Sequence, residues 1–329
     1  MCFLSVRVGK RVERRKSQRS ALVVREKTEN GMENGLANLW NRKRITKKAR
    51  AGRGLETIWE IPVQMEAIKK ALAGLFVQSP GKQEALPMLP GGLVPITQFC
   101  EQDVFIVGYP KSGNTWFQDI VSGLAFGMLP EFAPESLDLI PDVHHVAHYK
   151  RYATPMYFKS HFLPTPDYKR IVYLLRDGRD VMVSYHRFLV DLMNVKVDFL
   201  EAVETGKVFF PCKWHEHVQA WLANPFNAEM IVIKYEALNS NATHELQRFC
   251  DFVGLKRPPE FIKTIAEQTA FEKMRDREIK WRLSNPKLPK DKFFRRRGVV
   301  GSYKDEMPPE VLSVFMKDSA DTLRRCGYL

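Results

Sequence analysis

The chain has 329 residues, of which 44% are apolar and 27% charged, enough apolar material for one large domain or two ordinary ones and too much for a disordered protein. Its formal net charge of +13 is concentrated at one end, because residues 1–53 hold 16 Lys/Arg and 4 Asp/Glu, which leaves 35 of the 51 basic and 34 of the 38 acidic residues for positions 54–329. A nearly neutral body excludes a uniformly basic surface for nucleic acid, so any anion site in it must be a local pocket.

The five cysteines are odd in number, far apart and without a CxxC pair, which argues against a disulfide framework and favours a reducing compartment. No apolar run approaches the roughly 18 to 20 residues that span a bilayer. In a secretory signal the positive charges precede the apolar stretch, whereas here they follow a short one. We therefore expect a cytoplasmic protein without a membrane span. Organelle targeting by the basic N-terminus stays open as an alternative, although its glutamates argue against a transit peptide.

Residues 1–53 carry clusters of Arg and Lys, and their apolar residues do not recur with the period of a helix or a strand. This predicts a basic, disordered tail. Weak polyanion binding by this tail is a non-enzymatic alternative. Residues 54–100 combine a loosely helical leader with a Pro/Gly linker at Pro87–Pro95. No second linker follows, so residues 101–329 are predicted to form one domain.

After residue 100, short apolar runs alternate with longer helical patterns, as expected for a parallel sheet with crossover helices. Strands are predicted at Val104–Val107, Met156–Lys159, Ile171–Leu175 and Met230–Lys234. Helices are predicted at Asn114–Phe126, Asp180–Asp191, Lys213–Leu222, Ala242–Val253, Pro259–Glu267 and Glu310–Arg325. This order indicates an α/β, P-loop-like three-layer sandwich in which helices flank a central parallel sheet.

A turn with two glycines joins the first of these strands to a helix, in the string Gly108-Tyr-Pro-Lys111-Ser112-Gly113. Such a turn aims backbone N–H groups and a helix N-terminus at one point, which suits phosphate or sulfate, and Lys111 adds a positive charge. The Gly108-x4-Gly113 spacing copies the start of a nucleotide-binding P-loop, but Asn114-Thr115 replaces the Lys-Ser/Thr of that motif. A P-loop kinase or NTPase is therefore the alternative interpretation, opposed by the missing lysine.

Three strings together resemble the cytosolic sulfotransferase family. They are Tyr109-Pro-Lys-Ser-Gly-Asn-Thr-Trp116, the segment Ile171–Tyr185, and Phe294-Arg-Arg-Arg-Gly-Val-Val-Gly-Ser-Tyr-Lys304, and they span most of residues 103–305 in the family's order. The resemblance implies a transferase that moves a sulfuryl group from 3′-phosphoadenosine 5′-phosphosulfate (PAPS) to a hydroxyl or amine of a small-molecule acceptor, with PAPS as co-substrate and no metal.

PAPS carries a 5′-phosphosulfate and a separate 3′-phosphate, so it needs two anion sites. Arg176 closes a predicted strand and Ser184 lies about two turns into the next helix, so both can converge on one phosphate beyond the carboxyl end of the sheet. Arg296 and Arg297, beside Gly298, supply a second clamp from a distant loop.

The resemblance also implies an aromatic site for adenine, with Trp116 and Phe271 stacking on the base and Tyr235 and Thr269 making polar contacts beside it. The set predicted to bind the donor is therefore Lys111, Ser112, Gly113, Asn114, Thr115, Trp116, Arg176, Ser184, Tyr235, Thr269, Phe271, Arg296, Arg297 and Gly298.

His161, in the string Phe158-Lys159-Ser160-His161-Phe-Leu-Pro164, matches the position of the family's catalytic base. A histidine near its reference pKa of about 6.5 can take the proton of an attacking alcohol at neutral pH. By the same resemblance Lys111, assisted by Lys159, neutralises charge on the departing phosphate oxygen. His161, Lys111, Lys159 and Ser184 form the predicted catalytic set.

No metal site is expected, because the two histidine-rich segments, His144–His148 and Cys212–His217, have no recognised zinc spacing. The acceptor is expected to contact loops around Leu189–Phe210 and Trp281–Lys292, and its identity cannot be read from them. The segment after Lys304 lacks the Thr-Val pair of the animal enzymes' dimerisation motif, which argues against a homodimer by that route and leaves dimerisation open.

Overall fold

The computed structural model describes residues 92–128, 139–284, 293 and 295–329, all of which belong to one compact unit, Glu84–Leu329. The predicted basic tail, with its polyanion-binding and targeting roles, and the leader up to residue 91 lie outside the described residues. None of the described helices combines the length and the apolarity that a bilayer span requires. Cys100, Cys212, Cys250 and Cys326 are free thiols.

A parallel sheet forms the centre of the unit, with strand order β4-β2-β5-β6. Its strands are β2 (Val104–Gly108), β4 (Tyr157–Ser160), β5 (Arg170–Leu175) and β6 (Glu229–Lys234), and each lies within one residue of its predicted bounds. The chain leaves β2 for β4 on one side and later returns to add β5 on the other. Such a reversal in strand order leaves a crevice beyond the carboxyl ends of the strands, where open α/β sheets bind ligands.

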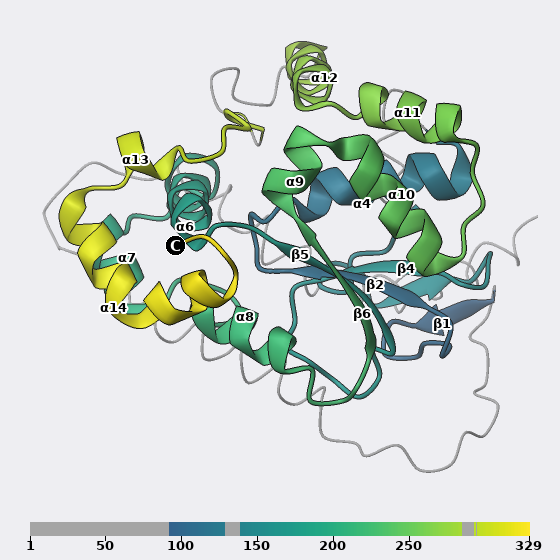
Figure 1. Ribbon diagram of the computed structural model, residues 1–329, viewed down its shortest axis with the longest axis horizontal. Coiled ribbons are helices and arrows are strands. Elements are labelled where there is room, and N and C mark those ends of the chain that lie inside the picture. Colours follow the sequence, from purple (N-terminus) through teal and green to yellow (C-terminus); the bar gives the residue numbers. More distant parts are fainter. Residues whose placement is uncertain (1–91, 129–138, 285–292, 294) are drawn as a thin grey trace, which may run out of the picture. The chain divides into compact units, whose positions relative to one another are not determined.

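Helices cover both faces of this sheet, which confirms the predicted three-layer sandwich (Figure 1). One layer contains α4 (Asn114–Phe126), α9 (Tyr235–Ser240), α10 (Ala242–Val253) and α11 (Pro259–Gln268). The opposite layer contains α6 (Gly178–Arg187), α7 (Phe199–Thr205), α8 (Trp214–Ala223) and α14 (Pro309–Arg325). Alternate residues of β2 supply the two cores, Val104 and Ile106 to the first layer and Phe105 and Val107 to the second, as the period of two of a strand requires.

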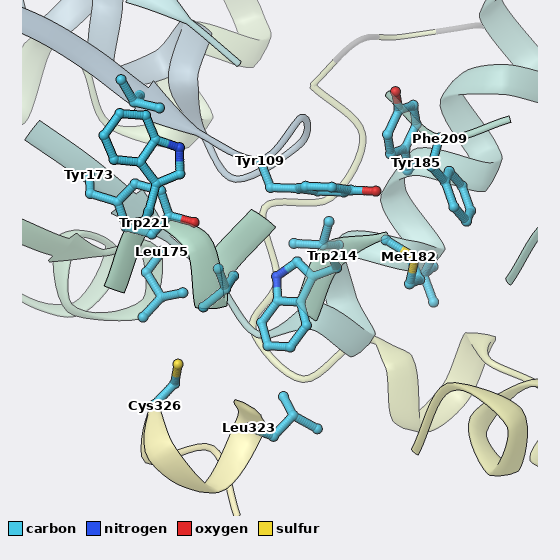
Figure 2. Packing of buried hydrophobic residues seen from close by; sticks show 14 of the residues in the cluster. Tyr109, Tyr173, Leu175, Met182, Tyr185, Phe209, Trp214, Trp221, Leu323 and Cys326 are labelled. Carbon is cyan, nitrogen blue, oxygen red and sulfur yellow. The ribbon is translucent and has the colours of Figure 1, made fainter. Parts of the chain in front are cut away.

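Aromatic side chains dominate the core beneath α6, α8 and α14, where Trp214, Trp221, Tyr109 and Tyr173 are all buried (Figure 2). The first turn of α6 approaches this core so closely that a Cβ on Gly178 would lie 2.5 Å from the Trp214 ring. The tight packing fixes the start of α6, the helix that presents Asp180 and Ser184 to the carboxyl edge of the sheet.

Five of the predicted helices are confirmed to within two residues, and the sixth, Asp180–Asp191, divides into α6 and a π-helical segment, Phe188–Leu192. The sequence patterns missed α7, α9, α12 (Phe271–Ser284) and α13 (Tyr303–Glu306), and they missed β1 (Leu93–Pro95), which pairs antiparallel with β3 (His148–Lys150). The expected acceptor loop Leu189–Phe210 contains α7, and Trp281–Ser284 is the end of α12, whereas 285–292 lie outside the described residues.

Candidate active site

The glycine loop lies at the carboxyl end of β2, the strand at which the strand order reverses. Gly108 fits there because a Cβ would sit 2.7 Å from the Leu174 carbonyl oxygen of β5. Lys111 has φ of 73° and Gly113 has φ of 99°, so the chain turns sharply before α4 begins. Ser112 Oγ is buried and makes no hydrogen bond to any described residue, which leaves a donor available for an anion in the loop.

Asn114 and Thr115 begin α4, but their side chains have different neighbours. The buried Asn114 amide bonds back to the backbone of the loop. With its oxygen turned towards Gly108, the amide accepts from Gly108 N at 3.0 Å and donates to Tyr109 O at 3.3 Å. Thr115 Oγ1 instead lies 3.5 Å from Lys159 Nζ. The Asn114 side chain thus supports the shape of the loop, and its place at the N-terminus of α4 is where an anion would meet the helix.

Arg176, one residue beyond β5, is attached directly to this loop. Its Nη1 donates to Lys111 O at 3.1 Å, and the guanidinium lies over the Tyr235 ring at 4.2 Å. The side chain is buried, yet its Nε makes no hydrogen bond within the described part of the chain. A fixed cation with an unused donor beside the loop is an arrangement that favours an anionic ligand.

The predicted adenine-binding residues come together beside the loop, where a Cβ on Gly113 would lie 3.0 Å from the Tyr235 ring. The indole Nε1 of Trp116 donates to Thr269 O at 2.6 Å, and the Trp116 and Tyr235 rings meet edge to face at 5.5 Å. Gly298, at φ of 67°, presses against Phe271 so closely that a Cβ would lie 2.5 Å from the ring. Residues from four distant segments therefore form one apolar corner beside the loop.

Arg296 and Arg297 lie in the segment that carries Gly298, and both are ion-paired with Glu306. Arg296 binds the carboxylate through both Nη atoms, at 2.6 and 2.8 Å, and Arg297 Nη1 binds it at 3.0 Å. These contacts hold the two guanidinium groups side by side. They also occupy donors that the sequence analysis assigned to a phosphate.

A buried carboxylate, Asp180, joins this segment to α6. Its oxygens accept from Gly301 N at 2.7 Å and Tyr303 N at 2.9 Å, and it lies 4.0 Å from Arg176. Ser184 follows one turn later on the same helix and is partly exposed. Arg176, α6 and the arginine-rich segment are therefore parts of one connected arrangement.

His161 is placed beside the glycine loop by the register of the sheet. Because Val107 pairs with Ser160 in the parallel ladder, His161 follows β4 where Gly108 ends β2, and His161 Nδ1 lies 2.7 Å from Gly108 O. A carbonyl oxygen only accepts, so Nδ1 carries the proton and Nε2 keeps its lone pair. Burial, followed by the nearby Lys159, lowers the pKa of His161 well below its usual value, so the ring is neutral.

Two lysines complete the cluster. Lys111 Nζ lies 4.5 Å from the centroid of the ring of Phe188, a residue of the π-helical segment that follows α6. Its burial, with Arg176 and Lys159 nearby, lowers the pKa of Lys111 to about 7. Lys159 Nζ pairs with Asp142 at 2.8 Å. Both ammonium groups are thus held at the carboxyl edge of the sheet.

Sequence reasoning passed over four residues of this arrangement: Asp142, His144, Asp180 and Glu306. The contacts of Asp180 join segments that are distant in the chain. No sequence spacing marks any of the four as a site residue, although His144 was noted as one of a histidine cluster. Among the described residues no three His, Cys, Asp or Glu side chains converge on a position that could hold a metal ion.

Residues 101–327 match the family model described as a sulfotransferase domain. The chain belongs to the sulfotransferase family. This confirms the resemblance drawn from the three motifs, and the match covers every described residue of the site.

Curated relatives of this sulfotransferase include Sulfotransferase 1E1 of Mus musculus, 24% identical over 252 residues that cover 68% of this chain and 84% of the relative. Sulfotransferase 1A1 of Canis lupus familiaris is 27% identical over 260 residues and covers the same shares. Among solved structures, retinol dehydratase in complex with androsterone and the inactive cofactor PAP has a TM-score of 0.53 at 22% identity, over 69% of this chain and 82% of that one. This structural likeness supports the fold.

Proposed function

We propose that this sulfotransferase transfers the sulfuryl group of PAPS to a hydroxyl or amine of a small-molecule acceptor, with His161 as general base. The observation that carries the proposal is the contact between His161 Nδ1 and Gly108 O, 2.7 Å long, which puts a neutral imidazole at the end of an anion-binding loop. In this proposal the loop that binds the donor and the histidine that acts as base follow two neighbouring strands, β2 and β4.

The residues present fit the nucleotide donor. Ser112 Oγ and Arg176 Nε are buried donors without a partner among the described residues. Ser112 lies in the loop assigned to the 5′-phosphosulfate, and Arg176 belongs to the set assigned to the 3′-phosphate. In this proposal the 3′-phosphate meets Arg176, Ser184, Arg296 and Arg297, and adenine enters the corner made by Trp116, Tyr235, Thr269 and Phe271. Two solved relatives are titled as complexes with PAP, which supports the same choice of donor.

The proposed reaction is a direct displacement at sulfur. The acceptor oxygen or nitrogen forms a bond to sulfur, and the bond between sulfur and the bridging phosphate oxygen breaks. The acceptor proton passes to Nε2 of His161, whose Nδ1–H stays bonded to Gly108 O. Lys111 stabilises the negative charge that appears on the departing phosphate oxygen, with Lys159 close by.

The aromatic rings that border His144, whose own ring stacks on His161, favour an apolar acceptor. The centroids of the Phe162 and Phe210 rings lie 6.0 Å apart, and both rings border the His144 ring. One solved relative, retinol dehydratase, is titled in one structure as a complex with retinol and PAP and in a second structure as a complex with androsterone and PAP. For this chain we extend the proposal to a small apolar alcohol or phenol, without a commitment to one compound.

The donor is tested by thermal shift with 3′,5′-adenosine bisphosphate (PAP) and with Mg-ATP, because the P-loop NTPase alternative predicts stabilisation by the second. The acceptor is tested by a labelled-PAPS screen over phenols, steroids, fatty alcohols, amines and sugars. Stabilisation by Mg-ATP alone would contradict the proposal.

The roles of the two central residues are tested by substitution. We expect His161→Ala to lower kcat by about 10² to 10⁴ through loss of the base, with the affinity for PAP nearly unchanged. Lys111→Ala is expected to lower kcat by about 10² to 10³ and to weaken PAP binding as well. Transfer at the wild-type rate by His161→Ala would remove the base assignment.

A further inference from the structure

The backbone of His161 is held at both of its polar groups by other histidines. His161 N donates to His144 Nε2 at 2.7 Å, and His161 O accepts from His217 Nε2 of α8 at 3.2 Å. The Tyr173 hydroxyl bonds the remaining ring nitrogen of His217 at 3.0 Å. With Gly108 O on the ring, His161 is therefore fixed at three points from three different segments.

The segment 140–145, which we call the strap, carries His144 along the open edge of the sheet. Lys159 N donates to Pro141 O at 2.9 Å and Val143 N donates to Lys159 O at 3.0 Å, so the strap pairs with β4 on the side that no described strand of the sheet covers. The Asp142 carboxylate accepts from His144 N at 3.0 Å while it pairs with Lys159 Nζ at 2.8 Å. His144 is thus anchored to the residue two positions before His161.

The surroundings of the His144 ring favour Nε2 as a hydrogen-bond acceptor and not as a donor. It lies nearly parallel to the His161 ring, with centroids 5.4 Å apart, and Phe162 and Phe210 border it at 4.2 and 5.3 Å. The charged or titratable groups that face it are Asp142, His145 and Lys159. Burial, then His145 and Lys159, lower the pKa of His144 to about 4 against the opposing effect of Asp142, so Nε2 keeps its lone pair at neutral pH.

We propose that His144 is a positioning residue for the general base: by accepting the His161 N–H it fixes the backbone from which the catalytic imidazole reaches the acceptor. His144 itself takes no proton from the substrate. This inference rests on the proposed function, since it requires His161 to act as the base. A shift of about 1 Å in a reacting group can lower a rate by about 10², so the contact should be visible in kcat.

The test compares His144→Ala and His144→Gln with His145→Ala. Glutamine is chosen because its amide oxygen can reach the same N–H that His144 Nε2 accepts. His145 is the matched control because it is the neighbouring histidine of the strap, with a side chain 76% exposed that contacts Asp142 and not His161. Transfer from labelled PAPS to one acceptor found by the screen gives kcat and KM, and calorimetry gives the affinity for PAP.

We expect His144→Ala to lower kcat by about tenfold or more, with acceptor KM and PAP affinity within about twofold of wild type. His144→Gln should recover most of kcat, and His145→Ala should match wild type. In the full-length chain, the amide proton of His161 should move upfield in His144→Ala, return towards its wild-type position in His144→Gln, and stay in place in His145→Ala. This NMR measurement reports on the hydrogen bond without any turnover.

Wild-type kcat in His144→Ala would overturn the positioning role. A glutamine variant as slow as the alanine variant, or an equal loss of PAP affinity, would also overturn it, because either result indicates a general packing effect. If the wild-type chain binds PAP and transfers nothing to any acceptor, the proposed function fails, and the His144 proposal fails with it. If wild type and His144→Ala transfer the sulfuryl group at the same rate, the positioning role of His144 is rejected while the proposed function stands.

Discussion

Lys111 combines a strained backbone with a perturbed charge. A φ of 73° costs a residue with a side chain about 1 to 2 kcal/mol, so the loop must be held by its surroundings, including Arg176 on the Lys111 carbonyl. Because burial lowers the pKa of Lys111 to about 7, its side chain exchanges between the neutral and the charged form near neutral pH before a ligand binds.

Donor binding should therefore take up a proton at Lys111. A bound anion favours the charged ammonium, so the affinity for PAP should fall as pH rises from 7 to 9, with net proton uptake on binding in this range. Calorimetry in buffers of different ionisation enthalpy measures the uptake. The phosphates of PAP add their own protons, so the quantity to compare is the difference between wild type and Lys111→Met. Equal uptake in both proteins would contradict the assignment.

Glu306 binds three N–H donors of Arg296 and Arg297. If these arginines bind the 3′-phosphate as proposed, Glu306 competes with that phosphate for them. We expect Glu306→Gln to tighten PAP binding by about two- to fivefold, the range that partly exposed ion pairs support. Adenosine 5′-phosphosulfate, which lacks the 3′-phosphate, should bind both proteins equally. The exposed Asp305→Asn removes a neighbouring charge and serves as the control. Weaker PAP binding by Glu306→Gln would indicate that the carboxylate orients the arginines.

At the scale of elements, the sequence predicts those segments whose local pattern is unambiguous. The strands β2, β4 and β5 are short apolar runs buried on both faces, and the edge strand β6 has an apolar run in which Ile233 is buried. The helices α10 and α14 have clear apolar stripes. By contrast, α12 reads FEKMRDREIKWRLS, in which charges interrupt every stripe, and α9 begins directly at the end of β6 without a loop. Their helical state depends on tertiary packing, which no local pattern contains.

The same limit applies to the site. The motif residues could be predicted by resemblance, and the contacts among Trp116, Arg176, Tyr235, Phe271 and Gly298 bring that set together. The residues that support them could not be predicted, because a carboxylate such as Asp180 binds backbone groups, those of Gly301 and Tyr303, that are far away in the sequence.

Glycine substitutions test how the arginine-rich segment is seated. Gly298 and Gly301 both have positive φ, 67° and 81°, but a Cβ added at Gly298 would meet the Phe271 ring, whereas one added at Gly301 would have no described atom within 4 Å. Gly298→Ala should displace the segment and weaken PAP binding by about tenfold or more, whereas Gly301→Ala adds only backbone strain of about 1 kcal/mol. Calorimetry with PAP measures both. Equal losses would indicate that strain, and not contact with Phe271, decides the outcome.

At the scale of the whole molecule, buried neutral histidines link the site to stability. Burial lowers the pKa of His144 to about 4 and of His217 to about 3, while unfolded histidines titrate near 6.5. Between these values the unfolded chain binds more protons, so the free energy of unfolding should fall as pH drops below 6.5, by about 1.4 kcal/mol per pH unit for each such histidine. Asp119, whose burial raises its pKa to about 6, acts in the opposite sense.

Urea unfolding at pH 7, 6 and 5 measures this dependence. The slope of unfolding free energy against pH should decrease by about one proton in His144→Gln. Parallel slopes in wild type and His144→Gln would show that His144 is not held neutral in the folded chain.

The carboxylate of Asp180 has a consequence for which nucleotides the chain accepts. It holds Gly301 and Tyr303 on one side and Arg176 on the other, and Arg176 in turn holds the carbonyl of Lys111. In the proposed complex, these hydrogen bonds and the ion pair set the span between the loop for the 5′-phosphosulfate and the clamp for the 3′-phosphate. We therefore expect regioisomers with their phosphate on another ribose oxygen to bind more weakly than PAP, because they carry the same charge on the wrong span.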